Sequence, residues 1–158
     1  MRKVVVDIIN KLNIDSEEDK KYLIYLVDCV FLGKNGIDIM VSKYDEEYFI
    51  YTFVNSDSSI KERFIYGKYK TADENEAINI IVSHLLHYYV RMESHKIFGW
   101  DEFFEVNDEV LRFETSLLEE ITTELSEDTK EYCNNGEDIY SITEDVIDTD
   151  FYRNWIYT

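Results

Sequence analysis

Residues 71–99 read TADENEAINIIVSHLLHYYVRMESHKIFG and contain the clearest helical pattern in the chain. Its large apolar residues recur every three or four positions, which indicates one face of a helix; they are Ile78, Ile81, Val82, Leu85, Tyr89 and Met92. Thr71-Ala-Asp-Glu74 matches a capping box, and Gly99 matches a helix end. The sequence therefore predicts a long central helix whose apolar face covers a sheet.

The residues before this helix predict that sheet. Three segments rich in β-branched and aromatic residues alternate with period two, and they span residues 36–44, 47–54 and 63–69. The connections at Asp45-Glu46 and at residues 55–59 are short enough to join antiparallel neighbours. We therefore expect a three-stranded antiparallel meander.

Two helices are predicted before the strands. Apolar residues at helical spacing mark the first helix (Val4, Val5, Ile8, Ile9 and Leu12) and the second, from about Glu17 (Tyr22, Leu23, Leu26, Val27, Val30 and Phe31). Ser16 is the expected N-cap of the second helix, and Gly33 its expected end.

The last third of the chain is predicted to be mostly helical. A short helix is expected at residues 101–104, a longer one over 106–125, and a last turn or two after Ser141-Ile-Thr-Glu144, a second capping box. We expect one α+β domain over residues 1–158, with a core in 1–100 and an acidic extension in 101–158.

Charge is distributed unevenly along the chain. The net charge is -18, and residues 101–158 carry eighteen Asp and Glu against three Lys and Arg, which leaves -15 in that part. Such a field repels nucleic acid and anionic membranes and attracts basic partners. The sequence therefore predicts a basic protein partner, with no direct nucleic-acid or membrane binding. The alternative is that the acids only keep the protein soluble.

Several features indicate a cytoplasmic protein. The N-terminal apolar run, Val4 to Val6, is too short for a signal peptide, and no run approaches the length of a membrane span. Cys29 and Cys133 show no C-x-x-C pairing, as expected for thiols in a reducing compartment. The oligomeric state is left open.

The candidate partner-binding site is the end of the chain, where acids alternate with large apolar residues. Its expected members are Glu137, Asp138, Glu144, Asp145, Asp148, Asp150, Tyr140, Tyr152 and Trp155. Carboxylates one helical turn apart would lie roughly 6 Å from each other, which is comparable with the spacing of backbone phosphates. Aromatic residues would supply the anchoring contacts. The alternative is that the aromatics dock the segment onto the domain's own core.

Three histidines suggest a second kind of site. His84, His87 and His95 share one flank of the central helix with Arg91. A zinc ion could use His84 and His87 with Glu76 or Cys133, but the spacing matches no established motif and Arg91 would oppose a cation. We therefore predict no metal and no cofactor, and we expect a partly exposed polar flank.

Two segments, ITEDVIDTDFYRNW (142–155) and GWDEFFEVNDEV (99–110), resemble the acidic and aromatic segments of small phage-encoded anti-CRISPR proteins, especially those that inhibit Cas9. The resemblance implies a stoichiometric inhibitor that blocks a basic nucleic-acid-binding surface or a nuclease domain. The chain has no G-x-S-x-G, P-loop or G-x-G-x-x-G motif, so we expect no enzymatic activity. The alternatives are an immunity protein that neutralises a nuclease toxin and a metal-dependent enzyme that uses the histidine flank.

Overall fold

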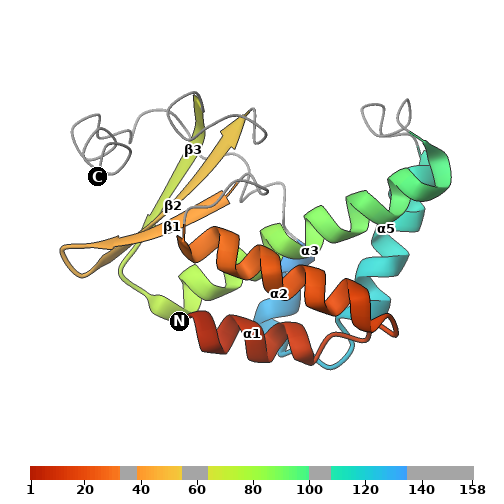
Figure 1. The fold of residues 1–158 in the computed structure, drawn as a ribbon, viewed down its shortest axis with the longest axis horizontal. Helices are drawn as coiled ribbons and strands as arrows, with labels where there is room; N and C mark the ends of the chain where they lie inside the picture. The colour runs from red at the N-terminus through yellow and green to blue at the C-terminus, as the bar shows by residue number, and fades with distance from the viewer. Residues whose placement is uncertain (33–38, 55–63, 100–107, 135–158) are drawn as a thin grey trace.

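The computed structural model describes residues 1–32, 39–54, 64–99 and 108–134. Along the chain the elements are α1 (Arg2–Asn10), α2 (Glu17–Leu32), β1 (Ile39–Tyr44), β2 (Glu47–Val54), β3 (Phe64–Thr71), α3 (Glu74–Phe98), α5 (Asp108–Ile121) and α6 (Glu127–Asn134). The sheet stands at one end of the helical part (Figure 1). The predicted α+β class is confirmed.

The three strands form the predicted antiparallel meander in the order β1-β2-β3. β1 pairs with β2 from Ile39 opposite Thr52 to Tyr44 opposite Glu47. Asp45 and Glu46 make the two-residue turn between them, with φ of 51° and 63°, as hairpin turns that match strand twist require. β2 pairs with β3, and the register shifts between Thr52 and Phe53. The predicted third strand is confirmed as β3, and it extends two residues beyond its predicted end, to Thr71.

The sheet has two different faces because side chains alternate along each strand. Ile39, Val41 and Ile50 lie on the inner face and belong to the core shared with the helices or pack against it. Met40, Phe49 and Tyr51 lie on the opposite side, which we call the outer face. The inner face therefore joins the sheet to the helical part.

The start of α3 corrects the predicted capping box. Asp73, not Thr71, is the N-cap: its side chain accepts hydrogen bonds from the backbone N–H of Asn75 at 2.9 Å and of Glu76 at 3.4 Å. Thr71 cannot take that role because it is still the last residue of β3, paired with Tyr48. Its hydroxyl accepts from the Asp73 N–H at 3.0 Å instead. The cap therefore lies two residues later than predicted.

α3 is buried on more than the one predicted face. Its buried residues include the expected Ile78, Ile81, Val82, Leu85 and Tyr89, and also Ala77, Ile80, Ser83, His84, Leu86, Val90 and Ser94. The helix touches β2 and β3, but it packs most extensively on α6 and α5 and also contacts α1 and α2. α3 is thus the centre of the fold, with Gly99 as the predicted C-cap.

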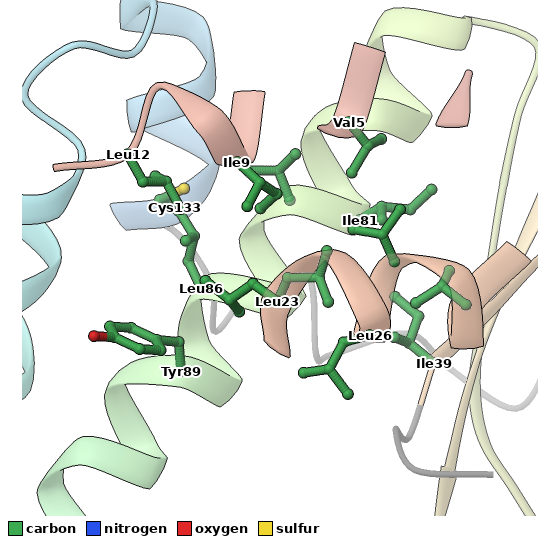
Figure 2. Close-up of a cluster of buried hydrophobic side chains, with 14 of the residues drawn as sticks. Val5, Ile9, Leu12, Leu23, Leu26, Ile39, Ile81, Leu86, Tyr89 and Cys133 are labelled. Carbon is green, nitrogen blue, oxygen red and sulfur yellow. The ribbon is translucent and has the colours of Figure 1, made fainter. Parts of the chain in front are cut away.

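The core gathers side chains from both ends of the described chain. Figure 2 shows Val5 and Ile9 of α1, Leu23 of α2, Ile81 of α3 and Cys133 of α6 turned toward one another. All of them are at most 1% exposed. Residues 101–158 therefore contribute to the same core as residues 1–100 through their described helices.

Both N-terminal helices are confirmed. The hydroxyl of Ser16 accepts a hydrogen bond from the Asp19 N–H at 3.2 Å, as its predicted capping role requires. Tyr22, predicted on the apolar stripe, is 39% exposed and stacks with Tyr25 at a centroid distance of 6.3 Å. The expected end at Gly33 lies outside the described residues, and α2 ends at Leu32.

The C-terminal helices differ in part from the prediction. The helix expected over 106–125 is α5, Asp108–Ile121. Its continuation is a turn followed by α6, a helix the sequence analysis did not predict. The elements expected at 101–104 and after Ser141 lie outside the described ranges. Within residues 1–32, 39–54, 64–99 and 108–134, no helix has both the length and the apolar character needed to cross a membrane.

Candidate functional site

All nine residues predicted to bind a partner lie in 135–158, outside the described part of the chain. The structure does describe the acidic segment that precedes them, α5 and α6.

α5, α6 and the turn between them carry a dense set of exposed carboxylates, which we call the acidic surface. Its members are Asp108, Glu109, Glu119, Glu120, Glu124, Glu127, Asp128 and Glu131. Over the same described range, 108–134, the only basic residues are Arg112 and Lys130. The Nζ of Lys130 lies 3.4 Å from Glu127 on the same helix. The acidic surface therefore keeps a strong net negative charge on ordered backbone.

The sequence of α5 explains why its charge faces outward. Val110, Leu118 and Ile121 recur at helical spacing and are buried. Phe113 packs edge-on against Phe98 of α3, with ring centroids 5.8 Å apart. Four exposed acids lie on this helix, and two of them, Asp108 and Glu109, stand in the first turn, where the helix dipole favours negative charge.

A row of polar residues on α3 fixes α5 and α6. Its members recur every three or four positions, so they share one side of the helix; they are Glu76, Asn79, Ser83, His87, Arg91 and Ser94. We call this row the α3 polar seam. Of its members, Glu76, His87 and Arg91 were considered from the sequence alone, whereas Asn79, Ser83 and Ser94 were not, although their spacing is visible in the sequence.

The middle of the seam binds α6. The Ser83 hydroxyl donates to the carbonyl of Tyr132 at 3.1 Å, and His87 Nε2 donates to the carbonyl of Cys133 at 2.7 Å. These carbonyls belong to the last turn of α6, where no intrahelical partner is available. One turn earlier, the Thr129 hydroxyl donates to Asn79 Oδ1 at 2.8 Å. Side chains of α3 thus supply hydrogen bonds that α6 cannot make internally.

The far end of the seam binds α5 through one buried acid. Glu114 Oε1 accepts from Arg91 Nε at 2.9 Å and from the Ser94 hydroxyl at 3.0 Å. A buried carboxylate is tolerated only when it is paired and hydrogen-bonded. Glu114 therefore serves the packing of α5, unlike the eight acids of the acidic surface.

The start of the seam lies against the sheet. Glu76 accepts hydrogen bonds from the hydroxyls of Tyr69 and of Thr71, the latter at 2.9 Å. Burial, followed by the charge of Glu76 and a hydrogen bond to it, raises the pKa of Tyr132. The Tyr132 side chain of α6 is therefore close to Glu76 and to the edge strand β3.

The expected partly exposed flank is correct for His87, Arg91 and His95, which are partly exposed, but not for His84. His84 is 6% exposed, and burial followed by the nearby His87 lowers its pKa to about 3. Burial also raises the pKa of the Cys133 thiol to about 12, which disfavours the thiolate that a metal needs. Within residues 1–32, 39–54, 64–99 and 108–134, no three His, Cys, Asp or Glu side chains form a group that could hold a metal ion. The suggested set of His84, His87, Glu76 and Cys133 is not brought together as ligands.

One open hollow of about 310 Å³ lies where α1, α2, the sheet and the start of α3 meet. Apolar side chains make up most of its wall, including Phe31, Val41 and Tyr48. Its lysine, Lys43, lies 5.4 Å from the centroid of the Tyr48 ring and 3.8 Å from Glu46. The N-terminal ammonium of Met1 and the carboxylate of Glu74, which also line the hollow, lie 3.6 Å apart.

Comparisons with known proteins add no assignment. No protein-family model, no curated protein and no solved structure matches the chain.

Proposed function

We propose that this protein is a non-enzymatic, stoichiometric inhibitor that binds a basic nucleic-acid-processing enzyme. A Cas9-type nuclease is the target class we favour, which would make the protein an anti-CRISPR protein of phage origin. The proposal follows from the charge distribution and from the resemblance of residues 99–110 and 142–155 to segments of such inhibitors. It places the protein in the cytoplasm of a bacterial cell, where that nuclease acts.

The observation that carries the proposal is the concentration of negative charge in the last third of the chain, -15 of the total -18. The part of this charge that lies on α5 and α6 is held on helices that are hydrogen-bonded and ion-paired to α3. Fixed charges can match a groove of fixed shape, whereas charges on a merely solvating tail cannot keep a spacing. This argument favours a binding role over simple solubility.

Carboxylate spacing supports a nucleic-acid-like surface. Glu127 and Glu131 are both exposed and lie four residues apart on α6, so their side chains are separated by roughly 6 Å. Neighbouring phosphates of nucleic acid have a comparable separation. A cationic groove that binds a phosphate backbone would therefore also attract this surface, and electrostatic attraction would mainly raise the rate of association.

Residues 137–155 are the segment we expect to make the specific contacts. Glu144, Asp145, Asp148 and Asp150 would pair with lysines and arginines of the target. The acidic surface of α5 and α6 would extend the same field and steer the encounter.

The first test is capture of the target by tagged full-length protein. A panel of nucleases, including Cas9 with and without guide RNA, is applied at about 0.1 M and about 0.5 M salt, which changes the screening length about twofold. We expect a nuclease to be retained at the lower salt, inhibited at equimolar ratio and released at the higher salt. Retention of no basic protein would reject the proposal. Capture of a toxin nuclease alone would favour the immunity-protein alternative.

A charge-reversal pair locates the interaction. One variant changes Glu144, Asp145, Asp148 and Asp150 to Lys, and we expect it to lose inhibition. The matched control changes four exposed acids of the first hundred residues to Lys; they are Asp7, Asp15, Glu18 and Glu46. Because both variants have the same net charge, they differ only in where the changes lie. We expect only the control to keep its inhibitory activity. Full inhibition by the first variant, with both folded by circular dichroism, would overturn the proposal.

A further inference from the structure

β1 is an edge strand, because the sheet of the described residues has the order β1-β2-β3. Tyr44 and Glu47 flank the two-residue turn, and such a flanking pair exchanges both of its hydrogen bonds. Hydrogen-bonded and non-hydrogen-bonded pairs alternate from there, so the N–H and C=O groups of Val41 and Lys43 point away from β2. Within residues 1–32, 39–54, 64–99 and 108–134, no other backbone group pairs with them. An edge of this kind is a template for a further strand.

The hollow beside α1 and α2 adjoins this edge. Its wall includes Val41, Ser42 and Lys43 of β1, with Phe31 of α2 and Tyr48 of β2. Val41 and Lys43 direct their side chains to the inner face, whereas Ser42 directs its side chain to the outer face. Ser42 therefore lines the hollow with its backbone, so the hollow reaches the main chain of the edge strand. A cavity of about 150 Å³ holds benzene, and the hollow, at about 310 Å³, has room for one aromatic side chain.

The turn end of this edge is accessible. Figure 1 shows the β1–β2 turn projecting beyond the described helices, and Lys43 and Tyr44 are 53% and 61% exposed. Edge lysines often protect a strand from pairing, but the Nζ of Lys43 lies 5.4 Å from the ring centroid of Tyr48 and 3.8 Å from Glu46. Because Tyr48 belongs to β2, the Lys43 side chain leans away from the open edge and leaves its own main-chain groups accessible.

Charge decides which kind of strand fits this edge. A second copy of the chain would add another net charge of -18, and repulsion between two such chains opposes association. A basic partner is attracted instead. Asp45 and Glu46 are exposed at the turn, and Glu74 at the hollow is 51% exposed. These carboxylates favour a lysine or an arginine in the segment that pairs with β1.

We propose that the open edge of β1 binds an extended, basic segment of a partner protein, which adds to the sheet as an antiparallel fourth strand. Main-chain hydrogen bonds to Val41 and Lys43 give affinity, and alternate side chains give specificity. The two partner residues opposite Val41 and Lys43 face inward and are apolar, and one of them fills the hollow. The next inward-facing residue lies beside Asp45 and Glu46 and is Lys or Arg. The partner pattern is therefore basic-x-apolar-x-apolar.

This surface uses none of the residues 137–155, and the proposal does not rest on the inhibitory function. Amide hydrogen exchange of the full chain alone tests whether the edge is open. We expect the N–H groups of Val41 and Lys43 to exchange on the order of ten-fold faster than those of Met40 and Ser42, which pair with β2. Equal protection at all four positions would show that another strand already occupies the edge, and it would overturn the proposal. Protection of Val41 and Lys43 that rises with protein concentration would assign the edge to a second copy and would overturn it as well.

A synthetic peptide tests binding to the ¹⁵N-enriched full chain. The probe is acetyl-Arg-Thr-Phe-Thr-Val-amide, which has the proposed pattern. We expect saturable shifts of the amide signals of Val41, Lys43 and Phe31. The matched control peptide carries N-methyl groups on its Phe and Val, so it keeps every side chain but loses the two donors that face β1. It should bind about ten-fold more weakly or less. Equal binding of the two peptides, or no saturable shift with the first, would overturn the proposal.

A pair of protein variants confirms the place of binding. Lys43→Pro removes an N–H that faces the open edge, so the ladder between β1 and β2 stays complete. We expect it to lose the peptide, whereas Lys43→Ala, which keeps the N–H, should bind like the parent protein. Val41→Phe, which fills the hollow, replaces Lys43→Pro if circular dichroism shows that the proline variant does not fold. Undiminished binding by the folded variant would overturn the proposal. No nuclease is present, so these outcomes are independent of the proposed inhibitory function.

Discussion

The Nε atom of Arg91 lies 2.9 Å from Oε1 of Glu114, and the Glu114 side chain is 11% exposed. This pair crosses from the central helix to α5, and the Ser94 hydroxyl donates to the same oxygen. The acidic helix therefore depends on one of its own acids, neutralised in the interior, to keep the remaining ones at the surface.

Replacing Arg91 by Ala should destabilise the protein clearly. The substitution leaves the Glu114 carboxylate buried with its main cation removed, a change that costs about 3–5 kcal/mol for fully buried pairs. Because Arg91 is 34% exposed, we expect a smaller loss of about 1–3 kcal/mol in the free energy of unfolding. Equilibrium unfolding in denaturant of the parent protein and of Arg91→Ala measures this loss.

Lys130→Ala is the matched control. Lys130 also pairs with a glutamate, but its partner Glu127 is 91% exposed, and such surface pairs contribute roughly 0.2–1 kcal/mol. Equal losses for Arg91→Ala and Lys130→Ala would contradict the role assigned to the buried pair.

Stability should decrease with acidification through about pH 6 because of His84. The unfolded chain protonates this imidazole near pH 6.5, whereas burial in the folded chain lowers the pKa to about 3. Between these two values the unfolded state binds more protons, so stability is present above pH 6.5 and is lost as the pH falls. One such group contributes up to about 1.4 kcal/mol per pH unit.

The slope of the free energy of unfolding against pH identifies the residue that titrates. We expect the free energy of unfolding of His84→Leu to depend less on pH between about pH 7 and pH 5 than that of the parent protein. The difference in slope should correspond to the uptake of close to one proton fewer on unfolding. His95→Gln, at a half-exposed position of the same helix, is the comparison. If both variants keep the parent slope, His84 is not the group that titrates.

Gly99 should resist substitution for conformational reasons alone. Its φ of 85° and ψ of 179° lie in a region open essentially to glycine, and an added Cβ would meet no atom within 4 Å. Gly99→Ala is expected to cost about 1–3 kcal/mol. Gly99→Asn should cost as much, because asparagine tolerates the left-handed helical region, not this one. Rescue by Asn in thermal unfolding would be evidence against this backbone conformation.

Asp73 should behave as the N-cap of α3. Asp73→Ala removes the acceptor for two backbone N–H groups and should lower the free energy of unfolding by about 1 kcal/mol. Asp73→Asn keeps an acceptor in the same place and should cost only a few tenths of that amount. Equal losses in the two variants would argue against the cap.

The elements with a strong local signal were predicted well from the sequence. β2 has the predicted bounds because aromatic and β-branched residues fill it without interruption after Glu47 and a two-residue turn precedes it. The length of α3 follows from its apolar spacing and from Gly99. In both cases neighbouring residues along the chain carry enough information, so no tertiary contact is needed to predict the element.

Features that depend on tertiary contacts were missed. α6 is short and mostly polar, and its local signal is Ser126, whose hydroxyl accepts from the Thr129 N–H. The position of α6 depends on the α3 polar seam. The sequence suggests that these polar residues lie at the surface, because it does not show which helix packs against them. The exact cap of α3 was missed because strand pairing retains Thr71. The candidate partner-binding residues, 137–155, stay a prediction.

The central position of α3 also has a consequence for biosynthesis. The helix is complete at Phe98, but α5 and α6, which cover its polar seam, end only at Asn134. A ribosome adding about 5–20 residues per second needs about 2–7 s for the 36 residues in between. During this interval the nascent chain presents half of its central helix without its later neighbours, so the N-terminal helices and the sheet are the only described elements available to hold it.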